Sequence, residues 1–208
     1  MKWIARLIMK IGGIDLTSLR VKLTGKPYNL LDDDLKHLLS LFKKSNYIVL
    51  TKRSWSLGSL MVTIASTILT RKKAFWTHAL MNVEGDVGAP VLMEAIGKGV
   101  TISDFFHVFA CDAVVVLRPR IPKGFEMNWE GLNDAAYSNL GKEYDTLSDI
   151  LDDQKMNCSE YVWKCLSKIP DADIWFNGLR VMIENNKNLC PQMLYDCGCF
   201  EVVFEIRR

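Results

Sequence analysis

The chain has 208 residues, 49% of them hydrophobic, and a formal net charge of +2. A chain of this length and composition can bury a sizeable core as one domain, and a second small domain is not required. Because basic and acidic residues nearly balance, the composition argues against an obligate nucleic-acid binder. The six cysteines are irregularly spaced, unlike a disulfide framework, which favours mostly reduced thiols in a cytoplasmic protein.

The N-terminal residues 1–11 are basic and apolar, but Arg6 and Lys10 interrupt the apolar run and no small-residue cleavage site follows. This pattern is a poor signal peptide. On a helix, one face would be apolar, formed by Ile4, Leu7, Ile8 and Ile11. Such a helix either packs against the domain or makes a peripheral contact with an anionic membrane through residues 1–12. The most apolar window, residues 57–69, is too short and too polar to span a membrane.

Hydrophobic periodicity predicts helices over residues 31–44, 56–69, 128–140 and 158–169. The helix over 31–44 is amphipathic, with three aspartates near its start and two lysines at its end. His37 falls on its polar side, so we expect a solvated surface histidine. The helix over 56–69 is so apolar that we expect it to be buried. Residues 14–30 and 171–183 show no decisive period.

Short apolar runs rich in β-branched residues predict strands over residues 47–51, 77–83, 91–96, 112–118 and 200–206. A glycine-rich turn over 84–88 joins two of these strands, and residues 119–127 form a loop with two prolines. The last strand alternates well enough to close a sheet. The elements together predict an α+β fold in which an antiparallel sheet packs on helices.

Cys158 stands at the start of a predicted helix, directly after Asn157, which is a suitable N-cap residue. At this position the free backbone N–H groups and the helix dipole favour a thiolate, and the thiolate is the nucleophilic form of cysteine. The alternative is that Cys158 is a small buried residue without chemistry.

His78 lies at the start of a predicted strand, where backbone bonds would fix it while its ring faces the neighbouring layer, an arrangement that suits a general base. Glu94 is an acid inside an apolar strand, and a buried carboxylate needs a partner. Two adjacent antiparallel strands would place Glu94 beside His78 and fix the imidazole tautomer. The alternatives are a structural histidine and an acid at the strand edge that faces water.

The other candidate positions are weaker. His107 lies in a largely apolar run, which is more typical of a core histidine than of a second base. Cys190, Cys197 and Cys199 follow a spacing that fits no common zinc pattern. The sequence contains no glycine-rich phosphate loop, so we expect neither a metal nor a cofactor.

Short motifs occur in a characteristic order: Trp76-Thr77-His78, then Glu94-Ala95-Ile96 with Gly99-Val100, Leu117-Arg118-Pro119, Gly141 with Tyr144-Asp145, and Asn157-Cys158-Ser159-Glu160. This order resembles the circularly permuted branch of the NlpC-type papain-like superfamily, the YiiX-like proteins. Permutation puts the histidine strand before the cysteine helix, the reverse of the order in papain. The resemblance covers about residues 47–204.

The resemblance implies a permuted papain-like domain over residues 45–208, with residues 1–44 as a helical N-terminal extension. It implies a cysteine hydrolase with Cys158 as nucleophile, His78 as base and Glu94 as the group that orients His78. Tyr144 resembles a tyrosine near the site in similar proteins, and would contact substrate or the oxyanion. The thiolate–imidazolium pair would cleave an amide bond through an acyl-enzyme, with peptidoglycan peptides as the implied default substrate.

Two other functions stay open at this stage. One is a lipid acyl hydrolase or acyltransferase at a membrane surface, whose partner is a lipid ester or amide. The other is a non-catalytic interaction protein that keeps the fold, in which the thiol pKa would stay near about 8.5. The substrate depends on loops that carry no recognisable code.

Overall fold

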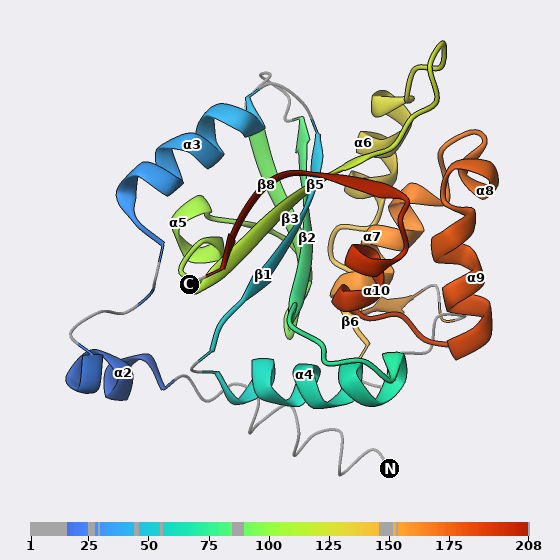
Figure 1. Ribbon diagram of the computed structural model, residues 1–208. Coiled ribbons are helices and arrows are strands. Elements are labelled where there is room, and N and C mark those ends of the chain that lie inside the picture. Colours follow the sequence, from blue (N-terminus) through green and yellow to red (C-terminus); the bar gives the residue numbers. More distant parts are fainter. Residues whose placement is uncertain are drawn as a thin grey trace.

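A computed structural model of the chain describes residues 16–24, 28, 30–43, 46–54, 56–84, 90–145, 152 and 154–207. Its centre is a six-stranded antiparallel sheet with the strand order β4-β3-β2-β1-β5-β8 (Figure 1). The strands are β1 (Tyr47–Lys52), β2 (His78–Glu84), β3 (Pro90–Ile96), β4 (Gly99–Ser103), β5 (Ala113–Pro119) and β8 (Phe200–Arg207). The predicted α+β class and the antiparallel sheet are therefore confirmed.

The central strands β1 and β5 are buried along almost their whole length. Their residues pair in register from Ile48 with Leu117 to Lys52 with Ala113. Both strands are rich in valine, leucine and isoleucine rather than alternating in polarity, which is typical of strands covered on both faces. The sheet therefore has a helical layer on each side.

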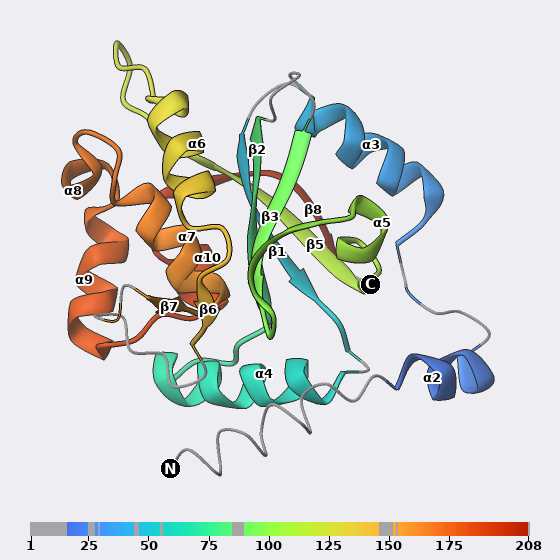
Figure 2. The same cartoon turned by 180° about the vertical axis from the view of Figure 1, so that it is seen from behind.

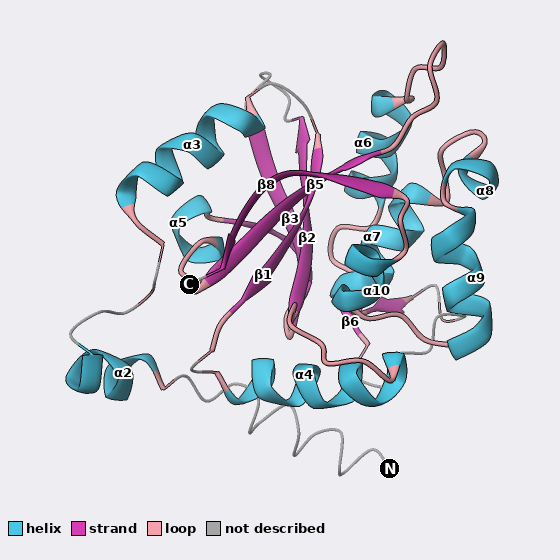
Figure 3. Ribbon diagram, viewed as in Figure 1, coloured by secondary structure: helices cyan, strands magenta, loops and turns pink. Residues whose placement is uncertain are grey.

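The larger layer consists of α6 (Trp129–Ser138), α7 (Cys158–Leu166), α8 (Ala172–Trp175), α9 (Asn177–Asn186) and α10 (Pro191–Asp196). These helices lie together on one side of the sheet, as Figure 3 shows in cyan against the magenta strands. They share one hydrophobic cluster with β2 and β3, in which Trp76, Tyr161 and Phe176 are fully buried. This cluster fixes α7 against the sheet.

The opposite side carries α3 (Asp32–Phe42) and α5 (Phe105–Val108), and Figure 2 shows both from behind. The amphipathic helix predicted over 31–44 is confirmed as α3, whose Leu38 and Phe42 are buried in a second cluster. His37 lies on the exposed side of α3, as predicted, with its ring 4.9 Å from that of Phe204.

Two helices lie at one edge of the molecule, α2 (Thr17–Thr24) and α4 (Leu57–Thr70). The predicted helix over 56–69 is thus confirmed as α4, but the prediction that it is buried was wrong. Within α4, Ser66 is its buried residue, at 1% exposure. An apolar sequence indicates burial only when protein covers the outer face, and the described part of the chain leaves this face open.

A short parallel pair of strands, β6 (Glu143–Tyr144) and β7 (Lys155–Met156), leads into α7. The backbone beside β6 approaches Gly99 so closely that a Cβ there would lie 2.3 Å from the carbonyl oxygen of Lys142. Gly99 also has a φ of 100°, which is strained for any residue with a side chain. Glycine therefore allows β4 to contact this segment.

The predicted glycine-rich turn over 84–88 and the N-terminal helix through which residues 1–12 would contact a membrane fall largely or wholly outside the described residues. Among the residues that the structure describes, none belongs to a helix with the length and hydropathy that a membrane span needs.

Candidate active site

The start of α7 presents the thiol of Cys158 at the first helical position, as predicted. Asn157 caps the helix, because its side-chain Oδ1 accepts from the backbone N–H groups of Ser159 (2.9 Å) and Glu160 (3.0 Å). In return, the carboxylate of Glu160 accepts a hydrogen bond from the backbone N–H of Asn157 (2.8 Å). This capping box fixes the backbone around Cys158, which is 6% exposed.

His78 and Glu94 are brought together by the pairing of β2 and β3. Leu80 is directly opposite Glu94, so His78 lies two residues along from it, in the diagonal position. The His78 Nε2–H bonds to Glu94 Oε2 at 2.5 Å, and the hydroxyl of Ser103 donates to Glu94 Oε1 at 2.5 Å. Both carboxylate oxygens are therefore engaged, and the ring orientation is set by three adjacent strands.

The second nitrogen of the His78 ring faces the sulfur of Cys158. The thiolate and the ring are hydrogen-bonded, and the backbone N–H of Ala79 and the hydroxyl of Ser159 also donate to the sulfur. Since Glu94 holds Nε2, the nitrogen that faces the sulfur is Nδ1. The order Ser103, Glu94, His78, Cys158 forms one chain of hydrogen bonds.

Electrostatics favour the charged form of this pair. Burial raises the pKa of Cys158, but the charge and hydrogen bond of His78 outweigh it, so the thiol pKa is lowered. Burial likewise lowers the pKa of His78, but the Cys158 thiolate and then Glu94 raise it to about 10. A lowered thiol pKa beside a raised imidazole pKa means that proton transfer to His78 is favoured.

Glu94 stays ionised in spite of its position. It is 4% exposed, and burial alone raises its pKa, yet the hydrogen bond and charge of His78 together with the Ser103 hydroxyl lower the pKa to about 2. A permanent carboxylate on Nε2 stabilises the imidazolium and fixes the tautomer of the neutral ring.

Tyr144 lies close to the sulfur because β6 pairs with β7. Its register partner is Met156, two residues before Cys158. Burial, followed by the charge of Cys158, raises the pKa of Tyr144. The phenol therefore keeps its proton at neutral pH and can donate a hydrogen bond near Cys158.

The segment before His78 is held by contacts that sequence reasoning missed. The N–H of Thr77 donates to the carbonyl of Thr51 (3.1 Å), and the N–H of Phe75 donates to the side chain of Gln192 (2.8 Å). Gln192 lies on α10, 117 residues further along the chain. No local sequence signal could have indicated the contact of Gln192 with Phe75. Ser103 is a polar residue at the end of an apolar run, but its contact with Glu94 can be predicted only when the register of β3 and β4 is known.

The two remaining histidines lie outside this group. His37 contacts Phe204 on the other side of the sheet. His107 is exposed on α5, so the prediction that it is a core residue was wrong. The run over 102–108 leaves the sheet after Ser103, because Asp104 caps α5 by accepting from the N–H of His107.

The other cysteines differ from Cys158, and all six are free thiols. Burial raises the pKa of Cys111 and of Cys165 to about 12. Cys199 is the exception, since a hydrogen bond from Cys197 lowers its pKa to about 6, so any test of thiol reactivity has to identify the modified residue. The residues described by the structure contain no group of three or more acidic, histidine or cysteine side chains that could hold a metal ion.

The fold and the site define an α+β protein in which a helix-start cysteine, a strand histidine and a buried glutamate form one hydrogen-bonded set. Comparison of the chain with protein-family models, with curated proteins and with solved structures finds no match.

Proposed function

We propose that this chain is a papain-like cysteine hydrolase of the circularly permuted kind, which cleaves an amide bond through an acyl-enzyme. The observation that carries the proposal is the geometry of His78, whose ring bonds to Glu94 on one side and to Cys158 on the other. A nucleophile, a base and a group that orients the base are the parts that covalent acyl transfer needs.

In the first half of the reaction, the Cys158 thiolate attacks the carbonyl carbon and the carbonyl oxygen becomes an oxyanion. The backbone N–H of Cys158 lies at the first helical position, where no intrahelical acceptor exists, and can donate to this oxygen. Tyr144 supplies a protonated phenol nearby. His78 then transfers its Nδ1 proton to the leaving nitrogen, the C–N bond breaks, and a thioester remains on Cys158.

In the second half, neutral His78 accepts a proton from a water molecule, whose oxygen attacks the thioester carbonyl. The C–S bond breaks, the acid product leaves, and the proton on His78 restores the thiolate–imidazolium pair. Glu94 stays ionised throughout, because its pKa of about 2 is far below that of His78. Its part is to hold and to stabilise the imidazolium.

The order of the elements supports the permuted assignment. The histidine strand β2 comes first, and the cysteine helix α7 follows 80 residues after His78. Helix α7 packs against β2 through the larger hydrophobic cluster. Papain-like sites use the same packing of a cysteine helix on the histidine strand, with the opposite chain order. Peptidoglycan peptides are the substrate class that the resemblance implies.

The first test is the alkylation of Cys158 by iodoacetamide as a function of pH, with the modified peptide identified by mass spectrometry. We expect Cys158 to react well below the free-thiol pKa of about 8.5. The variant His78→Ala should lose this reactivity, and the exposed control His107→Ala should keep it. Alkylation of Cys158 that rises only near the free-thiol pKa in all three proteins would refute the proposal.

The second test is turnover on amide substrates, with Cys158→Ala as the inactive variant. This change removes the sulfur from a site that is 6% exposed, and we expect the fold to be retained, as circular dichroism would show. Acyl-enzyme formation, detected by intact mass, should disappear. Turnover that persists in Cys158→Ala would exclude this cysteine as the nucleophile.

A further inference from the structure

Helix α4 has its polar side turned toward the protein. Ser59 accepts a hydrogen bond from the Thr77 hydroxyl (3.1 Å), and Thr67 accepts from the backbone N–H of Ala74 (3.1 Å). Ser66 is 1% exposed and its hydroxyl bonds to the thiol of Cys190. The side that faces the protein therefore contains three small hydroxyl residues, next to Leu69, which packs against the larger cluster.

The outer side of α4 is apolar. Leu60, Ile64 and Ile68 follow one another at intervals of four residues, and they are 53%, 52% and 72% exposed. A helix on the surface of a protein in water normally has the reverse arrangement, with its apolar side inward. A contiguous apolar stripe that faces outward marks a surface that meets an apolar partner.

Basic residues flank this stripe in the sequence. Residues 52–73 contain five of them, Lys52, Arg53, Arg71, Lys72 and Lys73, and no aspartate or glutamate. The first acidic residue after them is Glu84. The three cations that follow α4 are exposed. Basic residues therefore flank α4 at both ends, and those at its C-terminal end are exposed.

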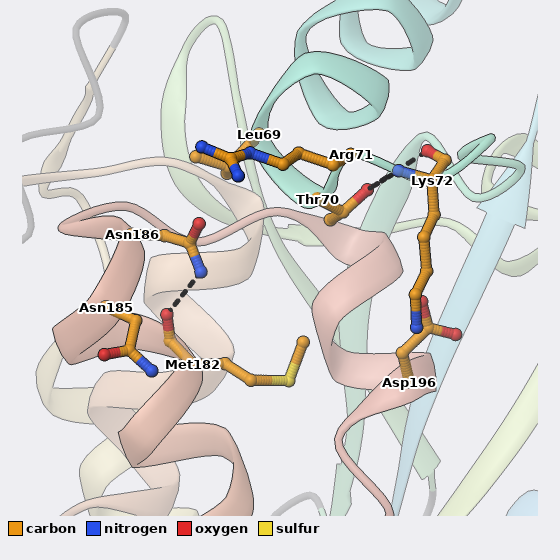
Figure 4. A pocket seen from close by; sticks show the side chains of 8 residues that line it. All are labelled: Leu69, Thr70, Arg71, Lys72, Met182, Asn185, Asn186 and Asp196. Carbon is orange, nitrogen blue, oxygen red and sulfur yellow. Dashed lines mark hydrogen bonds between the residues drawn. The ribbon is translucent and has the colours of Figure 1, made fainter.

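A polar pocket of about 330 Å³ lies at the C-terminal end of α4, between this helix and α9 and α10 (Figure 4). Arg71 and Lys72, directly after α4, line it together with Asn185 and Asn186 of α9 and Asp196 of α10. None of the proposed catalytic side chains lines this pocket. It adds hydrogen-bonding groups to the border of the apolar stripe, with two cations against one carboxylate.

Helix α2 lies at the same edge of the molecule as α4 in both views (Figures 1 and 2). Leu19 and Leu23, one helical turn apart, are 45% and 67% exposed. The neighbouring Arg20 fixes α2 to the body of the protein through a buried ion pair with Asp112. A second helix thus also exposes apolar side chains at this edge.

We propose that the α4 face, formed by Leu60, Ile64 and Ile68 with the cations Arg71, Lys72 and Lys73, docks on an anionic lipid membrane. An amphipathic helix whose apolar side inserts among the acyl chains while basic residues meet anionic headgroups binds membranes in this way. The stripe supplies the apolar part, and the three exposed cations after α4, which outnumber the one carboxylate of the adjacent pocket, supply the charge complementarity.

Two other occupants fit less well. In a two-fold dimer the same face meets its own copy, so the cations at both ends of α4 would meet cations in either helix orientation. Residues 1–15 carry Lys2, Arg6 and Lys10 against one acid, Asp15. A basic segment is a poor complement to a basic surface, and an anionic bilayer complements both.

Docking by α4 would place the catalytic site next to the membrane. Ser59 of α4 bonds to Thr77, the residue before His78. Ser66 of α4 bonds to Cys190, which lies close enough to Cys158 to sense its charge. This consequence rests on the proposed function, and it directs the search for substrates toward amides or esters attached to a membrane.

The test is flotation of the full-length protein with vesicles of phosphatidylcholine and phosphatidylglycerol in equal parts, compared with vesicles of phosphatidylcholine alone. We expect binding to the anionic vesicles only. The variant Ile64→Ser/Ile68→Ser should bind roughly 10- to 100-fold more weakly, because two half-inserted isoleucines together equal about one fully buried side chain. A second variant, Lys72→Gln/Lys73→Gln, should lose roughly tenfold or more.

A matched control uses isoleucines of the same exposure elsewhere. Ile102 and Ile174 are 53% and 73% exposed, and the variant Ile102→Ser/Ile174→Ser should bind as the wild type does. Cys158→Ala should also bind normally, which separates docking from catalysis. Unchanged binding of Ile64→Ser/Ile68→Ser would overturn the proposal. The proposal would also be overturned if the wild type bound no vesicles and sedimented as a dimer, while the variant Ile64→Ser/Ile68→Ser sedimented as a monomer.

Discussion

Replacing Glu94 with glutamine removes the charge that holds the His78 ring protonated while keeping the size of the side chain and an acceptor oxygen. The carboxylate bonds to Nε2 at 2.5 Å and is 4% exposed. The amide can take the same position, because its oxygen can accept from His78 Nε2 and its NH2 group can donate to the hydroxyl of Ser103. The change therefore reports the effect of the charge rather than the loss of a side chain.

The size of the effect follows from the geometry. With a 2.5 Å hydrogen bond, the two charge centres lie about 4 Å apart, which at an effective dielectric constant of about 20 is worth about 4 kcal/mol. This corresponds to about 3 pKa units. The His78 side chain is 25% exposed, and water offsets part of the loss. We therefore expect the His78 pKa to fall by about 2 units from its value of about 10.

The assay is an NMR titration of the histidine rings in protein labelled at histidine, where the chain has only three such residues to assign. Glu201→Gln is the control, since Glu201 is a partly exposed acid on β8 paired with Arg118 and should leave the His78 titration unchanged. A His78 pKa that stays near 10 in Glu94→Gln would show that Glu94 does not stabilise the imidazolium. The proposed division of roles between Glu94 and His78 would then fail.

Three further predictions concern stability and are measured by urea unfolding. Asn157→Ala removes the N-cap of α7 and should lower the free energy of unfolding by about 1 kcal/mol. An unchanged free energy of unfolding would mean that the cap does not stabilise the protein. Gly99→Ala should lower the free energy of unfolding by more than about 2 kcal/mol, because its Cβ would lie 2.3 Å from the carbonyl oxygen of Lys142. The control Gly124→Ala, with a φ of 88° but open space around it, should lower it by about 1 kcal/mol. The Glu94 pKa is lowered from 4.5 to about 2, so the ionised carboxylate adds about 3 kcal/mol to the free energy of unfolding above pH 4.5, and this contribution is lost as the pH falls toward 2. We expect the variant Glu94→Gln to lack this pH dependence. A wild type whose stability is equally flat between pH 4.5 and 2 would contradict the prediction.

Local signals made the cysteine helix α7 predictable. Asn157 before Cys158 is a capping pattern that spans a few residues, and the structure contains that cap. The diagonal contact of His78 with Glu94 could be predicted from two adjacent strands. Gln192 could not, because its contact with the chain before His78 joins residues more than a hundred positions apart.

Other elements gave too little signal or a misleading one. The strands β6 and β7 have two residues each, which is too short to show a period. Helices α8 and α9 mix aromatic and aliphatic residues, and their apolar spacing is interrupted where one ends and the other begins at residues 175–177. For α4 the composition indicated a helix correctly, but composition cannot say whether protein or another medium covers Ile64 and Ile68.

The order of the strands has a consequence for how the candidate site assembles during synthesis. His78, Glu94 and Ser103 can come together once β2, β3 and β4 have left the ribosome, but Cys158 follows much later and the sheet edge closes only with β8. Gln192 lies in that same late segment. Until α7 has packed against β2, Cys158 lacks the contacts with His78 and with the backbone of Ala79 that lower its pKa, so its electrostatic environment depends on the tertiary structure rather than on the cysteine helix alone.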